Sequence, residues 1–162
     1  MICAFSGHRP QKLPWGGRED DERCRALKTL LLETVGTLLD RGCDTFLCGM
    51  ARGCDTYFAE AVLRLRDERD PAARLIAMVP CPGQADRWPA RDRARYEALL
   101  LASDEVRVLE PAYSAGCMQR RNRAMAETCD LLVNVFDGSP GGTAETVRCA
   151  GRLGKPVLSL WR

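Results

Sequence analysis

The residues best suited to chemistry in this sequence are those that can bind a phosphate group. Gly141, Gly142 and Thr143 follow an apolar run and stand where a helix is expected to begin. Backbone N–H groups in the first turn of a helix have no partner within it, and the helix dipole adds partial positive charge there. Asp137 and Gly138 open the same turn, and its glycines equally suit a tight strand-to-helix connection that binds nothing.

Further candidate ligand-binding residues follow three other apolar runs. They are Ser6, Gly7, His8 and Arg9, then Gly49, Arg52, Gly53 and Asp55, then Gln84 and Trp88. An arginine such as Arg9 holds phosphate through two parallel hydrogen bonds, although it would be equally ordinary in a surface ion pair. Asp55 also stands where the cap of a helix is expected.

Asn122 interrupts a helical stripe that is otherwise apolar and consists of Met118, Met125 and Cys129. A buried amide needs a hydrogen-bond partner, which is either backbone or a ligand. The neighbouring arginines are expected to point elsewhere and to be solvated charges rather than an anion clamp; they are Arg120, Arg121 and Arg123.

The sequence leaves the roles of three aromatic residues and of one histidine open. Trp15, Trp88 and Tyr113 lie in expected loops, where they either stack on a base or fill the core. His8, the only histidine, is either an acid–base group or a neutral ring held near a turn. The sequence contains no Gly-x-Ser-x-Gly elbow, Walker A motif or regular Gly-x-Gly-x-x-Gly fingerprint, so the glycine turns predict a variant pocket.

The elements that must position these residues alternate along the chain. Short apolar runs predict strands at residues 2–5, 45–48, 75–79, 106–109, 131–136 and 157–160, of which 106–109 is weaker and alternates at first. Helical stripes separate most of these runs. This pattern predicts one α/β domain over residues 1–162, with a doubly wound, mostly parallel sheet of about six strands and helices on both faces. In such a sheet ligands bind beyond the carboxyl ends of the strands, where the strand order reverses. The loops after the first, second, third and fifth strands are expected to meet there, and the long connection 6–20 is typical of a binding loop.

Composition narrows the classes of function. Lys and Arg number 24 against 22 Asp and Glu, so a net charge of +2 argues against binding to nucleic acid or an anionic membrane. No apolar run is long enough to span a membrane, and no basic-then-apolar leader precedes Ile2, which predicts a cytoplasmic protein. The nine cysteines form no Cys-x-x-Cys pair, which predicts reduced packing residues and no metal site.

The combined motifs resemble the YpsA-like proteins, a branch of the SLOG superfamily. The matching stretches span nearly the whole chain: residues 6–13, Gly49 with Gly53 and Asp55, Gln84 with Trp88, residues 118–125, and Asp137-Gly138 followed by Gly141-Gly142-Thr143. The resemblance implies a Rossmann-like fold and a nucleotide or nucleotide-derived ligand, bound or sensed at the carboxyl edge of the sheet. It also raises a regulatory protein partner and a homodimer as hypotheses, since bacterial members are linked with cell division and stress regulation.

The same superfamily implies two alternatives. Its phosphoribohydrolases, the cytokinin-activating enzymes, cleave the N-glycosidic bond of nucleoside monophosphates with a glutamate, for which Glu145 is the candidate here. Glu145 stands one residue nearer to Thr143 than in that family, and one residue rotates a helical side chain by about 100°. Glu145 would alternatively complement the helix dipole. Related folds also occur in a DNA-processing protein, so single-stranded nucleic-acid binding is the second alternative.

Overall fold

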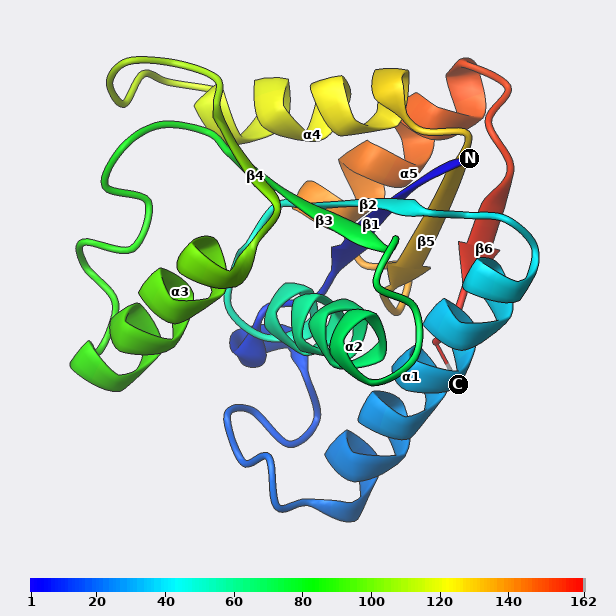
Figure 1. Ribbon diagram of the computed structural model, residues 1–162. Helices are drawn as coiled ribbons and strands as arrows, with labels where there is room; N and C mark the ends of the chain where they lie inside the picture. The colour runs from blue at the N-terminus through cyan, green and yellow to red at the C-terminus, as the bar shows by residue number, and fades with distance from the viewer. Residues whose placement is uncertain (162) are drawn as a thin grey trace.

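The computed structural model describes residues 1–161 of the 162-residue chain (Figure 1). Six strands alternate with five α-helices. The strands are β1 (Ile2–Gly7), β2 (Thr45–Cys48), β3 (Arg74–Val79), β4 (Glu105–Val108), β5 (Leu131–Val135) and β6 (Val157–Ser159). The helices are α1 (Glu22–Asp40), α2 (Cys54–Glu68), α3 (Ala90–Ala102), α4 (Cys117–Thr128) and α5 (Gly142–Arg152), with a short 3-10 helix at Pro10–Lys12.

All strand pairs are parallel, and the order across the sheet is β4-β3-β2-β1-β5-β6. The chain therefore builds outward from β1 in one direction through β4, and then returns to the other side of β1 with β5. This reversal places a crevice beyond the carboxyl ends of β1 and β5. The α/β, Rossmann-like class predicted from the sequence is confirmed.

Helices cover both faces of the sheet, as Figure 1 shows with α1 and α2 on one face and α4 and α5 on the other. Successive residues of a strand point to opposite faces. Phe5 and Phe46 accordingly pack with Phe58 of α2 in one core cluster, whereas Ala4 and Leu47 belong to a second cluster beneath α4 and α5. Burial on both faces is the reason that β1 and β2 are continuous apolar runs.

The helix ends follow local chemistry. Asp21 caps α1 by accepting a hydrogen bond from the Arg23 amide at 2.8 Å, as expected for an aspartate at this position. The expectation that Asp55 caps α2 is wrong. Gly53, at a φ of 84°, is the residue before the helix, and Asp55 lies in the first turn, where its carboxylate accepts from the amide of Ala51 at 3.1 Å.

The long connection after β1 is packed down on the domain. Leu13 and Trp15 are buried in the core, while Gln11 and Lys12 border the cavity described below. The nine cysteines of the described chain are free thiols, and all except Cys149 are buried. Within residues 1–161, no helix combines the length and apolar character needed to cross a membrane.

Candidate ligand cavity at the carboxyl edge of the sheet

A cavity of about 470 Å³ opens at the carboxyl edge, beside the reversal in strand order. The end of β1, the loop after β2, the start of α4 and the start of α5 contribute to its wall. Nine of the predicted ligand-binding residues line it: Ser6, Gly7, His8, Arg9, Asp55, Asn122, Gly141, Gly142 and Thr143. The structure thus brings together residues that are more than 130 positions apart in the sequence, and their binding of a ligand stays a prediction.

The β5–α5 turn presents backbone amides to this cavity. Gly141 precedes α5 at a φ of 151°, and no side chain within residues 1–161 caps the helix. The amides of Gly142, Thr143 and Ala144 belong to the first turn, so they lack partners within the helix. Ser6 donates from Oγ to Thr143 Oγ1 at 3.3 Å and fixes the end of β1 against this turn. Free amides at a helix N-terminus are a common place for anions to bind, and phosphate binding at this turn stays a prediction.

Two cationic side chains from the β1–α1 connection, Lys12 and Arg9, line the cavity. Lys12 donates from Nζ to the Pro140 carbonyl and lies 3.4 Å from Ser139 Oγ, so it is held against the β5–α5 loop. Arg9 contacts Met118 Sδ at 4.0 Å and forms no ion pair with a carboxylate of the described chain. Both cations therefore line the same cavity as the β5–α5 turn.

Arg121 corrects an expectation from the sequence, because it is buried rather than solvated. Only 3% of it is exposed, and it lines the floor of the cavity. Its guanidinium donates to the carbonyls of Gly49 and Met78, and its Nε donates to Asn122 Oδ1 at 2.8 Å. Burial lowers the pKa of Arg121, while Asp55 opposes that shift. Arg121 therefore joins α4 to the ends of β2 and β3.

Asp55 is the buried acidic counterpart of these cations. It is 5% exposed, and burial raises the pKa of its carboxyl from 3.8 to about 6 against the attraction of Arg121. The Ala51 amide and Arg9 also favour the charged form. Asp55 thus lies in the cavity wall as a desolvated carboxylate that neighbouring cations stabilise only in part.

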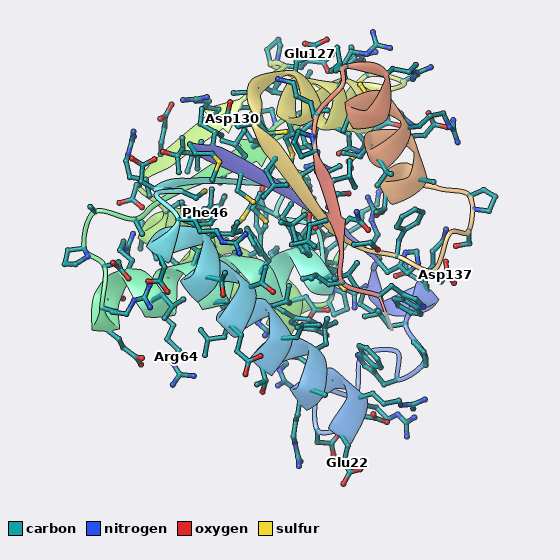
Figure 2. All side chains as sticks on the ribbon, turned by 90° about the vertical axis from the view of Figure 1, so that its right-hand side faces the viewer. Glu22, Phe46, Arg64, Glu127, Asp130 and Asp137 are labelled. Atoms are coloured by element: carbon teal, nitrogen blue, oxygen red, sulfur yellow. The ribbon has the colours of Figure 1, made fainter. Side chains whose placement is uncertain are left out.

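A contact between His8 and Asp137 holds the start of the β5–α5 loop. Asp137 is labelled in Figure 2. His8 is 3% exposed, and its Nε2 lies 3.0 Å from the Asp137 amide and 2.9 Å from Asp137 Oδ1. Asp137 also accepts from the Ser139 amide at 2.9 Å, and hydrogen bonds from Ser139 and His8 lower its pKa. Asp137 is therefore occupied in shaping the loop, and Gly138 completes the bend at a φ of 88°.

The other predicted site residues lie outside the cavity wall. Gly49 sits beneath Arg121, and its carbonyl also accepts from Gln84 Nε2 at 3.2 Å. Trp88 packs edge-on against Tyr96 with ring centroids 5.2 Å apart. Arg52 pairs with Asp92 at 2.7 Å. Gly53 allows close packing, since a Cβ there would lie 2.7 Å from the His8 carbonyl oxygen.

The aromatic side chains considered for base stacking also lie away from the cavity wall. Trp15 is buried in the core and Trp88 packs on Tyr96, whereas Tyr113 is 75% exposed.

Glu145 also lies away from the large cavity. It pairs with Arg148 on α5 at 2.5 Å and faces a small hollow of about 60 Å³ between α4 and α5. Its position in the first turn fits the dipole role. Glu145 therefore does not line the large cavity, and a catalytic role for it stays a prediction.

Sequence reasoning missed several residues that line the cavity: Gln11, Lys12, Ala51, Met118, Gln119, Arg121, Ser139 and Ala144. For Arg121 a signal existed, since it lies three residues after Met118 and four before Met125 on the inward stripe. Lys12 gave no such signal, because its position depends on how the loop folds back. In the described part of the chain, no three His, Cys, Asp or Glu side chains gather to hold a metal ion.

A comparison with known protein families identifies the family to which the chain belongs. A family model named YpsA, with the description YspA SLOG family, matches residues 3–149. The chain belongs to the YpsA family of SLOG proteins. Two curated relatives of this YpsA-family chain are a UPF0398 protein of Bacillus pumilus and the UPF0398 protein YpsA of Bacillus subtilis. The first is 26% identical over 144 residues, covering 88% of this chain and 76% of the relative; the second is 26% identical over 156 residues, covering 91% and 86%.

A solved structure shares the fold of this YpsA-family chain. DNA processing protein A from Helicobacter pylori, whose structure is described for its single-stranded DNA binding mode, superposes with a TM-score of 0.65 at 16% identity. The match covers 98% of this chain, which spans 64% of that protein. At this identity the likeness concerns the fold alone.

Proposed function

We propose that this protein binds or senses a nucleotide or nucleotide-derived ligand in the cavity beyond β1 and β5, with a phosphate on the N-terminus of α5. The observation that carries the proposal is the meeting of uncapped first-turn amides with two cations, Lys12 and Arg9, at one rim. Anions are stabilised at helix N-termini because the amide dipoles and free N–H groups act together.

The size and charge of the cavity support a ligand larger than inorganic phosphate. Its volume of about 470 Å³ lies within the range of about 300–1,000 Å³ that small-molecule sites occupy. Lys12 and Arg9 stand at the rim, whereas Asn122 and Arg121 continue the wall inward. A phosphate alone would leave this inner wall unused, whereas a nucleoside attached to the phosphate would fill it.

A thermal-shift panel of mono-, di- and cyclic nucleotides, NAD and ADP-ribose tests the proposal. A ligand that binds only the folded state raises the melting temperature, by an amount equivalent to about 2.7 kcal/mol at 100 times its Kd. We expect at least one member of the panel to do so. No shift with any of them would contradict the proposal.

Gly142→Val locates the binding site. A Cβ at Gly142 would lie 3.6 Å from Asn122 Nδ2, an ordinary contact, so the fold is expected to survive while the side chain fills the phosphate position. Gly151→Val is the matched control, since it makes the same change on the same helix at a position where a Cβ meets nothing within 4 Å. Binding should be lost in the first variant and retained in the second. Retention in both would place the ligand elsewhere.

A further inference from the structure

Asp55 is the only carboxylate among the described residues that line the cavity, and the lining also contains Arg9, Lys12 and Arg121. The cations suit the phosphate of a ligand, but the carboxylate repels it. Asp55 must therefore face a part of the ligand that donates hydrogen bonds, because an ionised carboxylate is an acceptor only.

The contacts of Asp55 within the protein leave part of its carboxylate free to accept hydrogen bonds. Its Oδ2 accepts from the Ala51 amide, and a backbone hydrogen bond from Gly7 also favours the charged form. Arg121 and Arg9 favour the charge without a direct ion pair. An ionised carboxylate offers about four acceptor sites, so two backbone amides do not saturate it. Burial raises the pKa of Asp55 to about 6, so at neutral pH the chain retains a negative charge that its surroundings disfavour.

The position of Asp55 indicates which part of a nucleotide it would meet. Ser6 of β1 touches Thr143 at the phosphate turn, and the next residue, Gly7, packs so tightly on α2 that a Cβ there would lie 2.5 Å from Cys54 Cβ. Gly7 also donates a backbone hydrogen bond to the Asp55 carboxylate, so this carboxylate lies beside the residue that follows Ser6. In a nucleotide the sugar is bonded directly to the phosphate, whereas the base lies beyond the sugar. The near neighbour of Asp55 is therefore the sugar.

Resting on the nucleotide site proposed above, we infer that the Asp55 carboxylate accepts hydrogen bonds from the vicinal 2′- and 3′-hydroxyl groups of a ribose. The cavity then selects ribonucleotides over 2′-deoxyribonucleotides. Hydrogen bonds to charged groups are stronger than those between neutral groups, so loss of one hydroxyl should weaken binding by about 10- to 100-fold. With such selectivity, occupancy of the site would follow the concentration of ribonucleotides rather than that of 2′-deoxyribonucleotides.

Titration calorimetry of the full chain with matched pairs of ribo- and 2′-deoxyribonucleoside phosphates tests this inference. The wild-type protein should show the preference, and Asp55→Asn should reduce it to within about threefold. Asp20→Asn, at an exposed position, is the matched control for the loss of one negative charge and should keep the preference. Inorganic pyrophosphate, which has no sugar, should bind Asp55→Asn at least as tightly as wild type.

The possible results separate this inference from the proposed function. Nucleotide binding without a ribose preference in the wild-type protein overturns the inference and leaves the nucleotide site standing. A preference that persists in Asp55→Asn overturns it also, since the discrimination would then come from another residue. If no nucleotide of the panel binds, both the proposed function and this inference fail.

Discussion

Replacing Asp55 by asparagine should stabilise the ligand-free protein at neutral pH, although it removes the carboxylate from the cavity wall. In the folded state burial raises the pKa of this carboxyl from 3.8 to about 6. Each pKa unit corresponds to about 1.36 kcal/mol, so the charged form destabilises the fold by about 3 kcal/mol once the pH exceeds 6. Asparagine has nearly the same shape and carries no charge, and so avoids this cost, while its one side-chain oxygen remains to accept from the Ala51 and Gly7 amides.

The sign of the pH dependence follows from the raised pKa. Below pH 3.8 Asp55 is protonated in both the folded and the unfolded states, and its charge has no effect on stability. As the pH rises toward 6, the unfolded chain releases the proton first, so wild type loses stability relative to Asp55→Asn. Above about pH 6 the difference reaches its full value and stays constant.

Urea denaturation at intervals from pH 4 to pH 8 measures this difference. Nucleotide must first be removed, because a bound ligand stabilises the folded state by mass action. The free energy of unfolding of Asp55→Asn minus that of wild type should rise by about 2 to 3 kcal/mol between pH 4 and pH 8. Comparing the two variants cancels groups with lowered pKa values, such as Glu19. A stability difference that is constant with pH, or a variant less stable than wild type at pH 8, would contradict the claim that charged Asp55 destabilises the fold.

Three further predictions concern other parts of the cavity. Arg121→Met should lower the free energy of unfolding by about 3 kcal/mol in urea denaturation. The change removes the Arg121 donor to the Met78 carbonyl and the cation that most favours the charged form of Asp55. The loss should be smaller in an Asp55→Asn background, and equal losses in the two backgrounds would exclude coupling between Arg121 and Asp55. Glu145→Ala should leave nucleotide affinity within about twofold in titration calorimetry, because Glu145 pairs with Arg148 outside the cavity; a tenfold loss would contradict its placement. A single-stranded oligonucleotide should not be retained at moderate salt in a filter-binding assay, given a net charge of +2, and strong retention would revive the nucleic-acid alternative.

The sheet and its helices could be predicted because burial leaves a direct trace in the sequence. Strands covered on both faces are continuous apolar runs, as in β1 and β3. The α1 stripe is buried as its spacing predicts, and it consists of Cys24, Leu27, Leu31, Val35 and Leu38. The glycine turns also predicted the location of the cavity, because every loop that follows a parallel strand begins at the carboxyl edge of the sheet.

What could not be predicted depends on contacts between distant segments. Arg121 is buried because two backbone carbonyls, from Gly49 and Met78, and the side chain of Asn122 receive its guanidinium, and backbone carbonyls carry no signal in the sequence. The loop after β3 was expected in the site, but β3 is separated from β1 by β2 in the sheet. Gln84 therefore reaches the Gly49 carbonyl rather than the cavity. The sheet order, which the sequence does not specify, decides which turns can meet.

The most direct test of phosphate binding at α5 is a crystal structure of the protein with the ribonucleotide that binds most tightly. Phosphate oxygens should lie within hydrogen-bond distance of the Gly142 and Thr143 amides, with Lys12 and Arg9 beside them and the ribose hydroxyls on Asp55. A nucleotide bound in the hollow beside Glu145, or in the large cavity with its phosphate turned away from α5, would contradict this placement.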